Sequence, residues 1–265
     1  MKVQTGQGTI PLITLIGIFS ISALNALPGL AVSPILGDLN KIFPSATDLE
    51  IQMLSSLPSL LIIPFILLSG KLTEKVNNLL LLQIGLAIFG VSGILYLLSN
   101  KMWQLIAISA MLGIGSGLIV PLSTGLISRY FVGAYRTKQF GYSSAITNIT
   151  LVLATTLTGY LAEVNWHLPF VVYLFPFISI FLTHYLKKDL SSYHPSDDIP
   201  SDTAKEMGKR GMNVKALIKL MAFYGLATYL VIIISFNLPF LMEEYGLSSG
   251  RAGILISLFF LAIMA

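Results

Sequence analysis

The chain has 265 residues, of which 55% are apolar and only 11% are charged. A soluble domain carries about 25% charged residues, so this composition excludes an ordinary water-soluble globular protein. The formal net charge is +4. The basic residues that produce it lie between apolar segments, where they suit a membrane surface and require no nucleic acid. With no cysteine in the chain, disulfides and cysteine-ligated metal sites are also excluded.

Eight long apolar segments follow one another along the chain. Apart from Lys219 and Arg251, which lie near the starts of two segments, they contain no Asp, Glu, Lys or Arg. About 20 apolar residues let a helix cross a bilayer, and a charge at its centre costs roughly 2.5–3.5 kcal/mol. The sequence therefore predicts an all-α, polytopic membrane protein. The predicted membrane helices cover residues 10–33, 51–70, 78–99, 103–127, 140–162, 168–186, 216–241 and 251–265.

The gaps between these segments alternate in their content of basic residues. If the N-terminus is cytosolic, 13 of the 16 Lys and Arg residues fall on the cytosolic side, whereas the 12 acidic residues divide equally. Cationic loops resist translocation, so this bias predicts a multi-pass protein of the cytoplasmic (inner or plasma) membrane with a cytosolic N-terminus. We expect the first segment to be retained, because only Lys2 precedes it and its apolar stretch continues past Pro28.

A polar stretch divides the chain after the sixth predicted helix. Residues 187–215 are rich in Ser, Asp and Lys and lack the apolar residues of a core, so we expect a cytosolic linker. It separates a six-helix bundle over residues 1–186 from two helices over residues 216–265, which we expect to begin an incomplete second bundle. Residues 34–38 and 239–243 form a weak internal repeat, each running from Pro to an acidic residue. Parallel repeats of helical bundles occur in transporters.

The loop between the second and third predicted helices carries a distinctive pattern, Gly-Lys-Leu-Thr-Glu-Lys-Val-Asn-Asn. It resembles the loop signature of the major facilitator superfamily, although it also fits an ordinary basic cytosolic loop. Asn77 and Asn78 replace the second glycine and a basic residue of that signature, and Glu74 stands for the usual Asp. The residues that fit the signature are Gly70, Leu72, Glu74 and Lys75.

Two further segments resemble the same superfamily. Residues 136–141 resemble its arginine-bearing loop between helices four and five, and residues 165–170 resemble its tryptophan-containing entry to helix six. The resemblance covers the whole chain, which corresponds to roughly the first two-thirds of a twelve-helix transporter. It implies two six-helix bundles that rock about a central site, and a cytosolic gate in which Glu74 approaches Arg136. The gate residues implied in this way are Gly70, Glu74, Lys75 and Arg136.

The marks of drug antiporters within this superfamily are incomplete. Ser109 stands where these antiporters carry an arginine before the glycines of helix four, and residues 154–159 keep only the last glycine of their helix-five signature. Ser109, Gly113, Gly117 and Pro121 instead recur at four-residue intervals on one face of helix four. Small residues at this spacing favour close helix packing.

Uncharged polar residues recur inside the predicted helices. Such side chains either line a cavity or hydrogen-bond between helices, and the sequence leaves both interpretations open. The candidate substrate-cavity residues are Asn25 in the first helix, Asn148 and Thr155 in the fifth, and Tyr224, Thr228 and Ser235 in the seventh.

These features favour a secondary active transporter, or a facilitator, that moves a small organic solute by alternating access. The expected partners are the lipid bilayer and a small-molecule substrate. We expect no cofactor, metal site or nucleic acid, and without a phosphate-binding loop the chain alone cannot drive transport with ATP. A coupling ion stays open, because proton coupling usually needs an intramembrane acid and these segments contain none.

Two other functions fit parts of the sequence. A non-transporting fragment or sensor on the same fold would have the same topology. More remotely, an intramembrane serine protease would use Ser116 as nucleophile and His184 as base. Nucleophile and base must lie within hydrogen-bonding distance, yet at 1.5 Å per residue their predicted depths differ by roughly 10 Å.

Cysteine labelling tests the predicted topology directly, because the chain has no native cysteine. Single cysteines replacing Lys71, Lys138 and Ser196 should resist a membrane-impermeant thiol reagent in intact cells. Single cysteines replacing Asn100 and Ser248 should react. Labelling at position 196 without permeabilisation would reverse the orientation.

Overall fold

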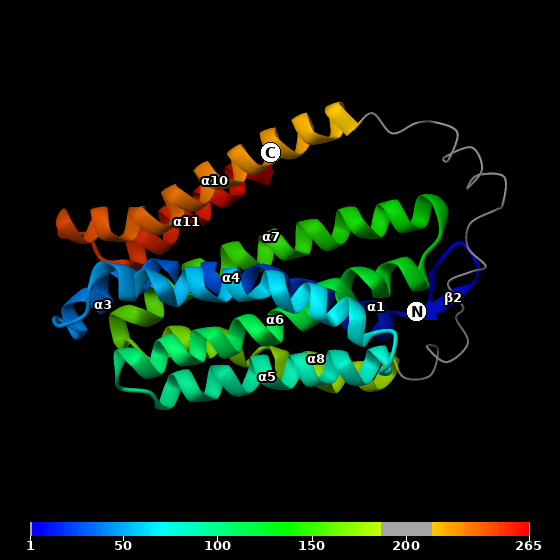
Figure 1. Cartoon of the computed structure of the whole chain (residues 1–265), viewed down its shortest axis with the longest axis horizontal. Coiled ribbons are helices and arrows are strands. Elements are labelled where there is room, and N and C mark those ends of the chain that lie inside the picture. Colours follow the sequence, from blue (N-terminus) through cyan, green and yellow to red (C-terminus); the bar gives the residue numbers. More distant parts are fainter. Residues whose placement is uncertain (1, 187–213, 265) are drawn as a thin grey trace.

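The computed structural model describes residues 2–186 and 214–264, which are almost entirely helical (Figure 1). Within these residues, seven helical segments are long and apolar enough to cross a membrane. The predicted all-α, polytopic fold is therefore confirmed. In chain order the elements are β1 (Lys2–Gln4), β2 (Thr9–Pro11), α1 (Leu12–Ala23), η1 (Leu24–Ala26), α2 (Leu27–Leu30), η2 (Ser33–Ile35), α3 (Leu36–Ile42), α4 (Asp48–Leu72), α5 (Asn78–Leu98), α6 (Met102–Tyr130), α7 (Gly133–Val164), η3 (Leu168–Leu174), α8 (Pro176–Thr183), η4 (His184–Leu186), α10 (Val214–Glu244) and α11 (Ser249–Met264).

The first six spans form one bundle in which α6 contacts α4, α5 and α7 (Figure 1). The element α11 packs along α7, and α10 contacts α3, η2 and α11. The predicted linker, residues 187–215, lies outside the described residues except for its last two positions, which belong to α10. The division into a bundle over residues 1–186 and the start of a second over residues 216–265 remains a prediction.

The first span is not the single helix predicted over residues 10–33. It continues to Ile42 as five short pieces, from α1 to α3. Pro28 (φ −62°, ψ 123°) and Gly29 (φ 86°, ψ −30°) leave the helical region, since proline lacks an amide donor and only glycine readily accepts a positive φ. A Cβ at position 29 would also lie 2.5 Å from the carbonyl oxygen of Ser55 in α4. The break therefore depends on glycine for its conformation and for the close approach of α4.

The small residues of α6 form the packing surface that the sequence indicates. A Cβ at Gly113 would lie 2.6 Å from the carbonyl oxygen of Pro58, and one at Gly117 would lie 2.5 Å from Cβ of Phe65. Both neighbours belong to α4. Because neither glycine has room for a side chain, α4 and α6 approach each other along their backbones.

Two short strands precede the first helix and were not predicted. The strands β1 and β2 pair antiparallel, with Val3 opposite Ile10, and Gly6 adopts φ 93° in the turn between them. The amide of Val132 donates to the carbonyl oxygen of Thr5 at 3.0 Å, which ties the hairpin to the connection between α6 and α7. The N-terminus therefore lies at the end of the bundle that carries the predicted cytosolic loops (Figure 1).

Candidate functional site

Hydroxyl groups of α7 bond to backbone carbonyl oxygens on both sides of the break in the first span. A bilayer offers no water to backbone carbonyl groups that a broken helix leaves free. Thr147 Oγ1 donates to the carbonyl oxygen of Ser22 at 2.9 Å. Thr158 Oγ1, which is fully buried, donates to the carbonyl oxygen of Ala31 at 2.7 Å. The two threonines are about three helical turns apart, so one face of α7 holds both arms of the broken span.

Asn25 lies in η1, between these two arms. Its Nδ2 donates to Ser123 Oγ of α6 at 2.9 Å, whereas its Oδ1 is buried without a hydrogen-bond partner among the described residues. The hydroxyl groups of Ser33 in η2 and Ser55 in α4 are also buried without a partner in this part of the chain. An unpartnered buried polar atom costs about 1–3 kcal/mol. These atoms are therefore suited to accept or donate hydrogen bonds to a polar group of a bound solute.

The two candidates on α7 have different surroundings. Asn148 is half-buried, and its Nδ2 donates to the carbonyl oxygen of Ser144, in its own helix, at 3.0 Å. Thr155 is fully buried, and its carbonyl oxygen would lie 2.6 Å from a Cβ at Gly253. Thr155 therefore lies in the contact between α7 and α11. Within the described residues, no hydrogen bond joins either side chain to Asn25.

The three candidates on α10 differ in exposure along the helix. Tyr224 is 73% exposed. Thr228 is half-buried and its Oγ1 donates to the carbonyl oxygen of Tyr224 at 2.9 Å. Ser235 is fully buried and lies in the half of α10 that approaches α3. The first turns of α10 stand apart from α7 in Figure 1, so this helix meets the bundle only toward its C-terminal end.

At the end of the bundle away from the N-terminus, α3 and α10 are in contact. A Cβ at Gly37 would lie 2.8 Å from the carbonyl oxygen of Pro239. Lys41 Nζ lies 3.5 Å from Asp38 Oδ1 and 3.6 Å from Glu243 Oε1. The two segments of the weak internal repeat therefore meet face to face at the predicted outer end.

A second contact at the same end joins α7 to α11. A Cβ at Gly159 would lie 2.6 Å from the carbonyl oxygen of Ser249, and Ser249 Oγ donates to the carbonyl oxygen of Gly159 at 3.1 Å. Glu163 Oε1 accepts a hydrogen bond from the amide of Gly250 at 3.1 Å. This carboxylate thus satisfies a free amide in the first turn of α11, where the helix dipole also favours negative charge.

The predicted gate residues lie at the opposite end and are not in contact with one another as an ion pair. Gly70, Glu74 and Lys75 are exposed. Arg136 Nε donates to the carbonyl oxygen of Phe131 at 2.8 Å, so its guanidinium caps the C-terminal end of α6. Among the described residues, the ion pairs do not include one between Glu74 and Arg136.

The serine-protease hypothesis finds no catalytic arrangement among the described residues. Ser116 is buried, and its Oγ donates to the carbonyl oxygen of Leu112 in its own helix at 2.8 Å. His184 is exposed in η4.

The first span of this apolar helical bundle is broken and is lined at the break with uncharged polar groups, as occurs in membrane transport proteins. Residues 14–265 match the family model described as the Major Facilitator Superfamily. The chain belongs to this superfamily of transporters.

Two relatives in sequence are bacterial. The chain is 32% identical over 142 residues to the quinolone resistance protein NorA of Staphylococcus aureus, a match that covers 52% of this chain and 36% of NorA. It is 28% identical over 161 residues to the multidrug transporter protein MdtP of Bacillus subtilis, covering 60% of this chain and 29% of MdtP. The matches therefore span about a third of the length of these relatives.

Solved structures share the fold at low sequence identity. A D-xylose–proton symporter superposes with a TM-score of 0.66 at 13% identity, over 94% of this chain and 66% of the symporter. A bacterial homologue of the human lysosomal transporter Spinster, in an inward-facing conformation, gives a TM-score of 0.62 at 16% identity, over 94% of this chain and 59% of that protein.

Sequence reasoning missed two of the hydroxyl groups that bond near the break. Thr147 and Ser123 are ordinary helix residues in the sequence, and only the position of the break gives them partners. Pro28 followed by Gly29 was the available signal, since this pair ends or bends a helix. The contact of Lys41 with Glu243 joins residues far apart in the chain and has no local signal.

We expect Gly37→Ala to weaken the contact between α3 and α10, because the new methyl group would overlap the backbone at Pro239. Overpacking of this kind costs about 1–3 kcal/mol. Nitroxide labels on cysteines that replace the exposed residues Pro44 and Tyr245 should report a longer mean distance between the two helices.

Two control variants define this test. Gly141→Ala should leave the distance unchanged, since no atom lies within 4 Å of a Cβ there. Lys41→Gln should change it little, because the Lys41 side chain is 61% exposed and such ion pairs contribute roughly 0–1 kcal/mol. An unchanged distance in Gly37→Ala would show that the two helices do not depend on this close approach.

Proposed function

We propose that this chain carries out secondary transport, or facilitated transport, of a small organic solute across the cytoplasmic membrane by alternating access. The observation that carries the proposal is the broken first span, where Asn25 Oδ1 is buried without a partner in the described residues. Superfamily membership supports transport. The names of the two relatives, a quinolone resistance protein and a multidrug transporter protein, support an organic solute as the substrate class.

We place the solute between the break and the neighbouring face of α7. Asn25 and Asn148 are the proposed solute contacts, because each is only partly buried and each carries an amide at mid-span. Thr155 and Ser235 are fully buried and would shape the cavity through helix packing. Tyr224 and Thr228 would line the side that α10 contributes. Asn25 Nδ2 donates to the Ser123 hydroxyl and Asn148 Nδ2 to the Ser144 carbonyl oxygen, which leaves further hydrogen-bonding capacity on each amide.

We propose that the described arrangement is that of a transporter closed at its outer end and open toward the cytosol. Support comes from the close contact of Gly37 with Pro239 at one end, and from the exposure of Tyr224 and Glu74 toward the other. The proposed orientation, with the N-terminus in the cytosol, follows from the distribution of basic residues.

Replacing Asn25 separates solute binding from helix packing. We expect a quinolone such as norfloxacin to raise the unfolding temperature of the purified chain in detergent, because a ligand that binds the folded state stabilises it. Asn25→Ala and Asn148→Ala should abolish this increase. If the two amides serve only as interhelical contacts, each variant should instead lose roughly 0.6–2 kcal/mol of stability and keep the ligand-induced increase.

Asn237→Ala is the matched control for Asn148→Ala. Asn237 Nδ2 donates to a carbonyl oxygen of its own helix at 2.9 Å, as Asn148 Nδ2 does at 3.0 Å, but Asn237 is exposed on α10. The Asn237→Ala variant should therefore show the full ligand-induced increase in unfolding temperature. A normal increase in both Asn25→Ala and Asn148→Ala would refute the proposed solute contacts.

We also propose that Glu74 pairs with Arg136 when the cytosolic end closes, with Gly70 and Lys75 completing the gate loop. In the open arrangement Glu74 is exposed and unpaired with Arg136, so Glu74→Gln should change its stability by less than about 0.5 kcal/mol. The same variant should lower the fraction of molecules closed at the cytosolic end when solute is present. This fraction can be read from the distribution of distances between spin labels placed across that end. Equal closed fractions in both proteins would remove Glu74 from the gate.

A further inference from the structure

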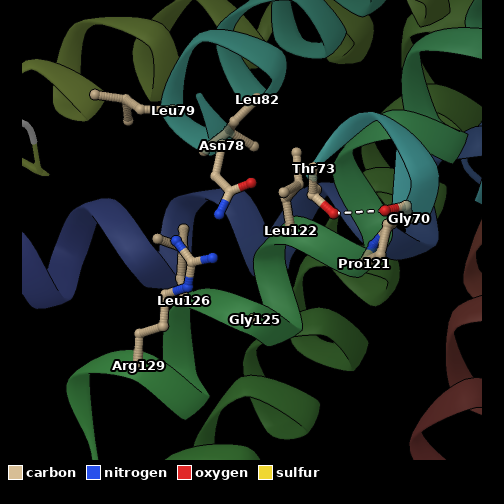
Figure 2. A pocket seen from close by; sticks show the side chains of 10 residues that line it. All are labelled: Gly70, Thr73, Asn78, Leu79, Leu82, Pro121, Leu122, Gly125, Leu126 and Arg129. Atoms are coloured by element: carbon tan, nitrogen blue, oxygen red, sulfur yellow. Dashed lines mark hydrogen bonds between the residues drawn. The ribbon is translucent and has the colours of Figure 1, made fainter. Parts of the chain in front are cut away.

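A pocket of about 190 Å³ lies at the N-terminal end of the bundle, between the end of α4, the start of α5 and the last turns of α6 (Figure 2). Its polar side chains are Thr73, Asn78 and Arg129. Four leucines supply much of its apolar lining, two from α5 and two from α6. Figure 2 shows Arg129 and Asn78 pointing toward each other across it. The pocket is distinct from the broken first span and from the proposed solute contacts.

Arg129 brings a positive charge to this pocket. The residue is half-buried, and among the described residues the ion pairs do not include it. The residues that line the pocket include no Asp or Glu. With its amide oxygen and nitrogen exchanged relative to Figure 2, Asn78 accepts hydrogen bonds from Arg129 Nη2 and, at 2.7 Å, from Nη1. A guanidinium has five N–H donors, so donors remain for an anion, and the Asn78 amide fixes its orientation.

Two glycines keep the pocket open. Gly70 and Gly125 both line it, and no atom lies within 4 Å of the position a Cβ would take at either residue. They differ in this respect from Gly113 and Gly117, which are filled by α4. Side chains at positions 70 and 125 would therefore occupy the pocket without displacing the backbone.

We propose that this pocket binds the phosphate group of an anionic phospholipid from the adjoining leaflet. Arg129 would donate to the phosphate, and Thr73 and Asn78 would contribute polar contacts at its rim. The leucine walls would cover the glycerol region, and the acyl chains would stay in the bilayer. The location favours a lipid over a soluble phosphate, because the pocket lies where α4 and α6 leave the apolar zone. Basic pockets between helices on the cytosolic side are suited to anionic headgroups.

Binding of a phospholipid in this pocket would make the position of the gate loop depend on the lipid composition of the membrane. Gly70 and Thr73 lie on the α4 side of the pocket, directly before the exposed Glu74, whereas Arg129 belongs to α6. A bound headgroup would therefore hold the loop between α4 and α5 against α6. This inference does not depend on the identity of the transported solute.

Lipid-dependent unfolding of the purified 265-residue chain in detergent tests the proposal. Dioleoyl phosphatidylglycerol should raise the unfolding temperature, whereas dioleoyl phosphatidylcholine and inorganic phosphate should not. Arg129→Gln should weaken the apparent affinity for phosphatidylglycerol about tenfold or more, as expected for a lost charge-assisted hydrogen bond. Gly125→Leu should abolish the effect by filling the pocket, and it provides a second test if Arg129→Gln fails to fold.

Lys71→Gln is the charge-matched control. Lys71 is exposed near the same end of α4 and does not line the pocket, so this variant should respond to phosphatidylglycerol like the unaltered chain. An equal loss in Lys71→Gln would indicate general surface attraction and overturn the proposal. Protection by inorganic phosphate alone would overturn the lipid assignment, and a full response in Gly125→Leu would exclude the pocket.

Discussion

The structure depends on one constraint, that every backbone polar group inside a bilayer needs a partner within the protein. An unbroken helix meets this requirement by itself, and the first span does not, because Pro28 and Gly29 leave the helical region. Carbonyl groups on both sides of the break, those of Ser22 and Ala31, accept hydrogen bonds from the hydroxyl groups of Thr147 and Thr158 of α7. These bonds fix α7 against both arms of the span, so the break that creates a polar centre also positions the helix beside it.

Close packing provides the second part of this arrangement. Lipid tails are as apolar as leucine, so burial of apolar surface contributes little to association of helices in a membrane. Glycines instead let backbones approach, at Gly113 and Gly117 between α6 and α4, and at Gly29 between the break and α4. The α4 helix is thereby held against both α6 and the first span. A rigid bundle results, in which the uncharged polar groups near Asn25 keep fixed positions.

The spans could be predicted from sequence because a charge within the bilayer costs several times more than any local preference. Their ends were less predictable. The α7 helix begins at Gly133, before the predicted start at residue 140. Its first turns contain Arg and Lys, which form helices well although they are not apolar. The surroundings of the candidate site residues were also less predictable than the spans. Asn25 is recognisable as a polar residue in an apolar helix, whereas its bond to Ser123 joins positions 98 residues apart and follows from the tertiary fold alone.

The contacts of α3 and α7 with α10 and α11 combine close glycine packing with buried apolar side chains. Gly37 lies against Pro239 and Gly159 against Ser249 as backbone contacts. Leu151 of α7 packs in addition with Ile256 and Phe260 of α11. The charges beside the glycine contacts, Lys41 and Glu163, are exposed and can exchange their partners for water at little cost. The positions of the helices here are therefore set by the glycine contacts and the apolar cluster rather than by the exposed charges.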